Sequence, residues 1–146
     1  MPRSRAHALA ILDESVAYFG QDPEERRAVF IDTKGNSGGE FISPDGTRKC
    51  IVGRFLVDPR GIMETHGITS TGGLLSKFGK DRFDEFFRPG YDGFPPDFYT
   101  QLERLHDNEA NWDENGLTET GLGKVVDIET WIREHLPDHE ELSRAA

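Results

Sequence analysis

The stretch "PPDFYTQLERLHDNEANW", residues 95–112, combines the apolar pattern of a buried helix with polar residues suited to chemistry. Its prolines stand where a helix begins, because the first helical position needs no backbone N–H. Phe98, Leu102 and Leu105 then follow at helical spacing along one face. The stretch therefore predicts a helix, with the ring of His106 at the border of its apolar face.

Two longer helices are predicted nearer the ends of the chain. Residues 4–20 repeat apolar residues at helical spacing, and Gly20 suits a left-handed C-terminal cap. Asp22 and Pro23 then predict the start of a short helix. The last helix is expected over residues 118–135, ended by Pro137. Its predicted core residues are Leu122, Val125, Ile128, Trp131, Ile132 and Leu136.

The intervening region is more varied. The runs "AVFID" (28–32) and "EFIS" (40–43) flank a glycine-rich segment and predict a small antiparallel hairpin. The run "KCIVGRFLV" (49–57) suits a strand or a helix, and the turn before it favours a helix. Residues 58–73 carry several glycines and a proline, so we expect a loop there. Short helices are expected over 74–79 and 81–87.

These elements predict one α+β domain over residues 1–136, mostly helical, with a small antiparallel hairpin in the N-terminal third. Residues 137–146 read as a frayed acidic tail. The single cysteine excludes an internal disulfide and favours a reducing compartment. No apolar run approaches the roughly 18 residues of a membrane span, so we expect no membrane association and a cytoplasmic location.

The chain carries 27 acidic and 17 basic residues, a formal net charge of −10. Such a charge discourages general binding to nucleic acid, which depends on contacts to phosphate. Against this background, three cations cluster around the cysteine at Arg48, Lys49 and Arg54. They predict a local site for an anion.

Cys50 has two interpretations. At the start of a helix beside cations, a thiol has a lowered pKa, and His106 with Asp107 would supply the base of a thiol hydrolase. Alternatively, Cys50 packs in the core beside Ile51 and Val52, where free cysteine is common. We favour packing and expect no catalytic residue. A serine at this position would then bury a hydroxyl without a partner.

Two loops add candidate ligand contacts. Small residues ahead of a predicted helix expose backbone N–H groups that can hold a phosphate or carboxylate: Thr69, Ser70, Thr71, Gly72 and Gly73. The loop after residue 87 places Tyr91 and Phe94 near Arg88, which suits a planar ligand. His106 is a further candidate contact at a pocket edge. For each loop the alternative is structural, a plain helix cap and an aromatic anchor to the core.

Metal binding has little support in the sequence. His135 and His139 are four residues apart, but Pro137 breaks the helical spacing that would align them. His66 stands alone in a predicted loop. We therefore expect neither a metal nor a cofactor.

The chain also resembles a loose group of small uncharacterised proteins found in phage and bacterial genomes. The resemblance spans about Asp32 to Trp112. It rests on a Pro-Gly turn before a Cys-x-x-Gly run and on a later L-x-x-x-H-D helix, at Phe41, Pro44, Gly46, Cys50, Gly53, His106, Asp107 and Trp112. Many members have alanine and a second cysteine where this chain has Ile51 and Arg54. The resemblance implies a shared fold and a phage-associated context, without an established activity.

The leading hypothesis is a non-catalytic phage accessory protein that binds a small anionic, nucleotide-like ligand, in the host cytoplasm and as a counter to host defence. The first alternative is an acidic inhibitor of a host protein, or a nucleic-acid mimic, using one negative face: Asp81, Asp84, Glu85, Asp107, Glu109, Asp113 and Glu114. The second alternative is the thiol hydrolase. The apolar surface left by short helices also predicts a homodimer.

Overall fold

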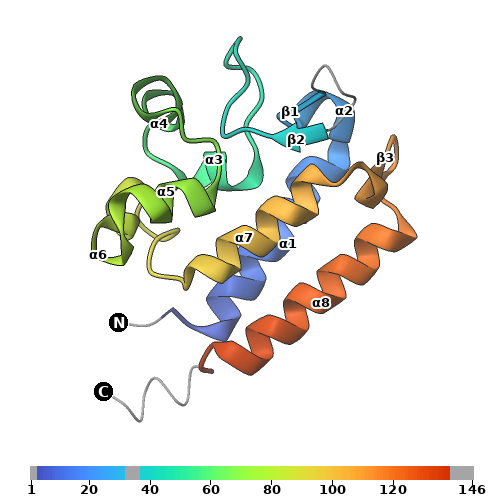
Figure 1. Cartoon of the computed structure of the whole chain (residues 1–146). Coiled ribbons are helices and arrows are strands. Elements are labelled where there is room, and N and C mark those ends of the chain that lie inside the picture. The colour runs from blue at the N-terminus through green and yellow to red at the C-terminus, as the bar shows by residue number, and fades with distance from the viewer. Residues whose placement is uncertain (1–2, 32–36, 139–146) are drawn as a thin grey trace.

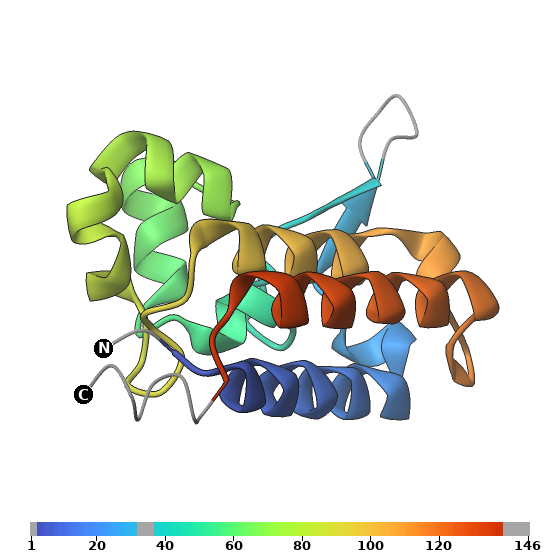
Figure 2. The same ribbon diagram turned by 90° about the horizontal axis from the view of Figure 1, so that it is seen from below.

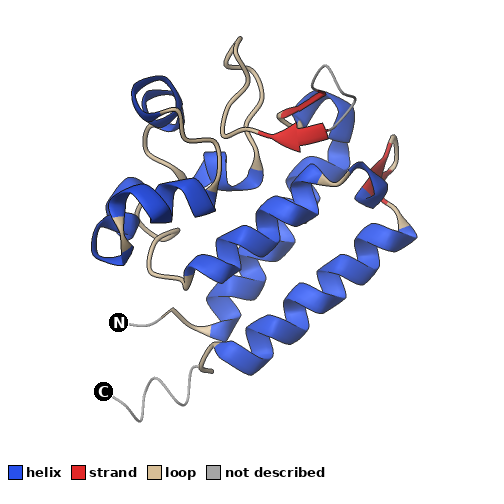
Figure 3. Ribbon diagram, viewed as in Figure 1, coloured by secondary structure: helices blue, strands red, loops and turns tan. Residues whose placement is uncertain are grey.

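The computed structural model describes residues 3–31 and 37–138. Its three longest helices are α1 (Arg5–Gln21), α7 (Pro96–Asp107) and α8 (Glu119–His135), and α8 packs on both of the others (Figure 1). Strands form only short hairpins in the described ranges (Figure 3). The predicted class, a mostly helical α+β domain, is confirmed.

Shorter helices occupy the middle of the chain. They are α2 (Pro23–Arg26), α3 (Ile51–Phe55), α4 (Pro59–His66), α5 (Thr71–Phe78), α6 (Lys80–Phe83) and the 3-10 turn η1 (Asp84–Phe86). Both α3 and α5 pack on α7, while α4, α5 and α6 gather at one end of the molecule (Figure 2). Helix α7 is therefore covered by α8 and by the short helices.

Two antiparallel hairpins complete the fold. Strand β1 (Val29–Ile31) pairs with β2 (Ser37–Gly39), so the predicted hairpin forms, and β2 packs on α7. Its second strand, however, lies in the glycine-rich segment and not at residues 40–43 as predicted. After the 3-10 turn η2 (Glu109–Asn111), β3 (Trp112–Asp113) pairs with β4 (Gly116–Leu117). Trp112 Nε1 and Asn111 Nδ2 donate hydrogen bonds to the Leu105 carbonyl, at 2.8 and 3.0 Å. These bonds hold the second hairpin to the end of α7, where helical carbonyls lack helical partners.

Helix starts follow side-chain caps. In five helices the capping oxygen accepts a hydrogen bond from the backbone N–H three residues later, at Ser4, Asp22, Asp58, Ser70 and Thr118. This corrects the predicted loop over 58–73. Asp58 caps α4, Pro59 begins it, and Gly67 ends it in the left-handed conformation, with φ of 67°.

Three further predictions have clear outcomes. The helical interpretation of residues 49–57 is confirmed by α3. Gly20 is not a left-handed cap, because α1 continues through Gln21. Leu122 is wrong as a core residue, since it is 56% exposed, whereas Ile128, Ile132 and Leu136 are buried. The predicted acidic tail lies outside the described residues from 139 onward.

Gly53 lies where α3 closely approaches the backbone of Phe41. A Cβ at this position would collide with the carbonyl oxygen of Phe41. The same carbonyl accepts a hydrogen bond at 3.2 Å from the backbone N–H of Cys50, the residue that caps α3. By contrast, a Cβ at Gly123, on the exposed side of α8, would meet no atom within 4 Å. The two glycines therefore differ in what they allow, although both are helical.

We expect Gly53→Ala to destabilise the protein by about 2 kcal/mol or more, because backbone must move to admit the methyl group. The matched change Gly123→Ala should stabilise it by about 0.5–1 kcal/mol, since alanine is the better helix former. Urea unfolding of both variants measures the difference. Equal effects would show that the contact at Phe41 is not restrictive.

Candidate functional site

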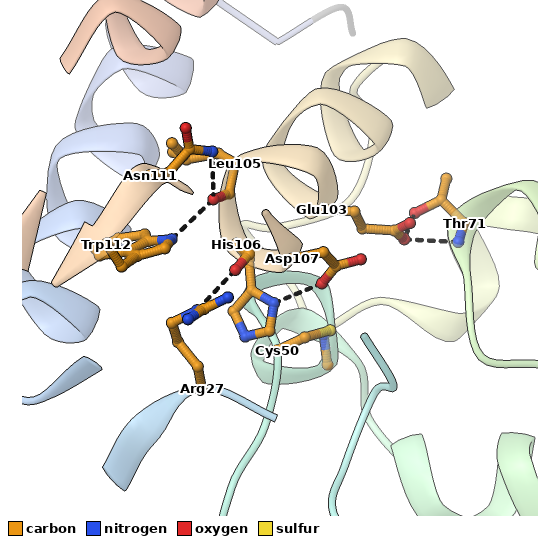
Figure 4. A network of polar contacts seen from close by, with 10 residues as sticks. Arg27, Cys50, Thr71, Glu103, Leu105, His106, Asp107, Asn111 and Trp112 are labelled. Carbon is orange, nitrogen blue, oxygen red and sulfur yellow. Dashed lines mark hydrogen bonds and ion pairs between the residues drawn. The ribbon is translucent and has the colours of Figure 1, made fainter. Parts of the chain in front are cut away.

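Polar side chains of α7 form a buried network (Figure 4). The His106 ring is fully buried, and its Nδ1 lies 2.6 Å from Asp107 Oδ1. Burial lowers the pKa of His106, while the Asp107 hydrogen bond and charge oppose that shift. A neutral imidazole can donate from Nδ1 to the carboxylate. His106 Nε2 is buried without a hydrogen-bond partner in the described part of the chain.

Arg27, which no pattern in the sequence indicated, contacts the same region. Its Nε donates to the His106 carbonyl at 2.7 Å, and its guanidinium lies over the Trp112 ring, 5.9 Å from the centroid. Burial lowers the pKa of Arg27, and the charges of Glu109 and Asp107 oppose that shift. Arg27 therefore ties the segment between α2 and β1 to the end of α7.

Glu103 lies one turn before Asp107 on α7 and meets the start of α5. Its carboxylate accepts hydrogen bonds from the Thr71 hydroxyl and from the Thr71 backbone N–H, the latter at 2.6 Å. Burial raises the pKa of Glu103 to about 7, although the bonds from Thr71 oppose the shift. The charge of Asp107 raises this pKa further, and that of Arg104 lowers it. No pattern in the sequence signals this contact, because Glu103 and Thr71 are 32 residues apart and meet only when α5 packs on α7.

The structure places Cys50 in the core. Its side chain is buried, and Sγ accepts the Gly53 N–H at 3.1 Å, so that the thiol caps α3. Burial raises the pKa of Cys50 well above its ordinary value, and the charges of Glu103 and Asp107 raise it further. Although Cys50, His106 and Asp107 come into one region, these surroundings favour the neutral thiol. A nucleophile requires the opposite.

For Cys50 we expect slow reaction of the folded protein with iodoacetamide near neutral pH, because the thiol is buried and protonated. Cys50→Ala should cost about 1 kcal/mol in the free energy of unfolding. Cys50→Ser should cost less, since its hydroxyl can accept the same Gly53 N–H. This reverses the sequence-based expectation that serine would lack a partner. Rapid labelling of the folded protein would contradict a packing role.

For Glu103 we expect a pH-dependent contribution to stability. A carboxyl with a higher pKa in the folded than in the unfolded chain stabilises the fold most below about pH 4.5, and this contribution is lost as the pH rises through about 7. Glu103→Gln cannot ionise and keeps an oxygen for Thr71. Between about pH 4.5 and 8, its stability relative to wild type should therefore rise by about 3 kcal/mol. Urea unfolding at both pH values measures this, with Glu114→Gln on the exposed turn as the control; parallel curves would refute it.

A second region, at the surface, gathers four of the predicted ligand contacts. We name it the basic pocket; its volume is about 260 Å³, and it is lined by Tyr18, Gly46, Thr47, Lys49, Arg54, Phe55, Arg88 and Tyr91. Helix α1, the segment before α3, α3 itself and the loop after residue 87 each contribute. Lys49 and Arg54 thus line the same pocket as Arg88 and Tyr91, although the two pairs are far apart in the sequence. All charged residues that line this pocket are basic.

Each of these groups is held in a defined place. Arg54 donates to both carboxylate oxygens of Glu14, at 2.7 and 3.2 Å. Its guanidinium lies 3.7 Å from the centroid of the Tyr18 ring. Arg88 Nε donates to the Leu56 carbonyl at 3.2 Å. No pattern in the sequence indicated Tyr18 or Glu14, because both approach Arg54 only when α1 packs beside α3.

The Tyr91 ring stacks on Phe55, with centroids 4.8 Å apart and ring planes 14° apart. Lys49 forms no ion pair with a described residue, and neither does Arg88. The pocket therefore combines two unpaired cations with a paired one and a stacked aromatic pair.

The other predicted contacts lie elsewhere. Arg48 does not line the basic pocket; it pairs with Glu25 at 3.7 Å and lines a different hollow. Phe94 is buried against Phe98. Residues 69–73 begin α5, where the Gly73 N–H bonds to Ser70 and the Thr71 N–H to Glu103. An internal carboxylate thus already occupies the helix start that we had predicted for a ligand anion.

The acidic residues of the predicted negative face are divided between two parts of the molecule. Those of α6 and η1 lie at one end, and those of η2, β3 and the following turn lie at the other (Figures 1 and 2). Within the first group, Glu85 pairs with Arg82, and Asp84 accepts the Gly93 N–H. One continuous acidic surface is not formed by these residues.

Among residues 3–31 and 37–138, no group of three or more His, Cys, Asp or Glu side chains is arranged to hold a metal ion. The helices of these ranges are all too short or too polar to cross a membrane. No protein-family model, curated protein or solved structure matches the chain.

Proposed function

We propose that this protein binds a small anionic, nucleotide-like ligand in the basic pocket without catalysing a reaction. The observation that carries the proposal is a contrast of charge. The whole chain has a formal charge of −10, yet the charged residues that line this pocket are all basic. A concave site of opposite sign to its surroundings attracts anions and raises their local concentration.

Two cations of the pocket are available for a ligand. Lys49 and Arg88 have no carboxylate partner among the described residues. A lysine ammonium acts on phosphate as a point charge, and an arginine adds directed N–H donors. Their different geometries suit a phosphate group that meets several donors at once.

The aromatic residues favour a ligand with a planar ring. Two guanidinium groups, those of Arg26 and Arg54, already lie over the Tyr18 ring, so this ring is engaged. Tyr91, stacked on Phe55, is the better platform for a base. The pocket volume of about 260 Å³ lies just below the usual range for small-molecule sites, about 300–1,000 Å³, and favours a mononucleotide over a larger nucleotide.

A phage-associated context, a role against host defence and a homodimer stay predictions from the sequence. The acidic inhibitor loses support because its residues do not share one face. The thiol hydrolase loses support because Cys50 is buried and its pKa is raised. A binding protein agrees best with the arrangement of the described residues.

Calorimetry against a panel of linear and cyclic nucleotides tests the proposal. We expect Lys49→Ala to weaken binding about tenfold, since a hydrogen bond to a charged group contributes about 1.5–3 kcal/mol. The neighbouring change Arg48→Ala removes the same charge outside the pocket and should leave affinity unchanged. An absence of heat with every nucleotide, for folded protein, would refute the proposed function.

A further inference from the structure

The guanidinium of Arg54 already holds an anion that belongs to the protein. Nη2 donates to Glu14 Oε1 at 2.7 Å and Nη1 to Glu14 Oε2 at 3.2 Å, which makes a two-pronged pair. An arginine fork accepts a carboxylate and a phosphate in the same way. The pair therefore places a carboxylate where a phosphate of a ligand would bind.

We infer that the ligand carries a terminal phosphate monoester, which displaces Glu14 from Arg54. This inference rests on the proposed function of the basic pocket. The Glu14 carboxylate meets Arg54 and forms no ion pair with Lys49 or Arg88 among the described residues. A phosphate monoester has three terminal oxygens and, above its second pKa of about 6, nearly two negative charges. It can occupy the Arg54 fork and still reach an unpaired cation.

The exchange requires little rearrangement. The Glu14 side chain is 47% exposed on α1, and its only ion pair in the described ranges is with Arg54. It can therefore turn into water when a ligand arrives. The Arg54 side chain is only 22% exposed and stays against the Tyr18 ring. The guanidinium is thus already oriented for the incoming phosphate.

Glu14 then acts as an internal competitor that sets the selectivity of the pocket. A ligand gains binding free energy at Arg54 only to the extent that it interacts with the guanidinium more strongly than the Glu14 carboxylate does, through greater charge or more contacts. A phosphate monoester exceeds it in both. A phosphodiester, with one charge and two free oxygens, exceeds it in neither. The pocket should therefore prefer a mononucleotide with a terminal phosphate to a cyclic or internally esterified one.

The test compares Glu14→Gln with Asp13→Asn, using inorganic phosphate and adenosine 5′-monophosphate at about pH 8. Both variants lose one negative charge, but Asp13 is exposed and contacts no cation of the pocket. An amide holds a guanidinium less strongly than a carboxylate does. We expect Glu14→Gln to bind both probes about tenfold more tightly than Asp13→Asn does, as expected when a charge-assisted pair is removed. Equal affinities, or no binding of phosphate by either variant, would overturn the inference.

A second comparison uses the methyl ester of adenosine 5′-monophosphate, which has one charge and two free oxygens. Wild-type protein should bind it about tenfold more weakly than the monoester. Equal binding would also overturn the inference. The two levels of failure are distinct. Loss of all nucleotide binding refutes the proposed function, whereas binding that depends on Lys49 but not on Glu14 refutes only the displacement.

Discussion

Burial of helix α7 is the constraint on which the rest of the structure depends. Phe98, Leu102 and Leu105 are fully buried where α8 packs on one part of the helix and α3 and α5 pack on another. Polar residues on the same helix consequently lose access to water and need internal partners. Glu103 finds Thr71 at the start of α5, and His106 finds Asp107. The hydrogen bonds that satisfy α7 thus also fix the neighbouring elements.

The basic pocket is a consequence of how α3 docks on this helix. Cys50 faces the core and caps α3, and the close approach of Gly53 to Phe41 holds the short helix in place. Lys49 and Arg54 flank these buried residues and are therefore directed to the opposite side, toward α1 and the loop of Arg88. The residues between Lys49 and Arg54 are buried in the core, so the two cations are left to line the pocket.

Local signals in the sequence predicted much of the fold. Apolar spacing located α1, α7 and α8, and a capping residue followed by proline located the start of α2. The helix α4 was missed because we took its glycines as evidence for a loop. The sequence also contains a helix-start signal at Asp58 and Pro59 and a helix-end signal at Gly67. Leu122 was misplaced in the core because its spacing fits the apolar face, although it lies 56% exposed. Periodicity identifies a helix more reliably than it identifies the residues that a neighbour will cover.

By itself, the sequence determined the helical class, the excess of negative charge and the presence of cations around Cys50, because these depend on composition and on residues close in the chain. The tertiary structure decided which of those cations share a pocket. It separated Arg48 from Lys49, joined Arg54 to Arg88 and Tyr91, and brought Glu14 and Tyr18 to Arg54. It also turned the start of α5 from a candidate anion site into the partner of Glu103. Each outcome depends on contacts between residues far apart in the chain, which packing around α7 creates and local pattern does not encode.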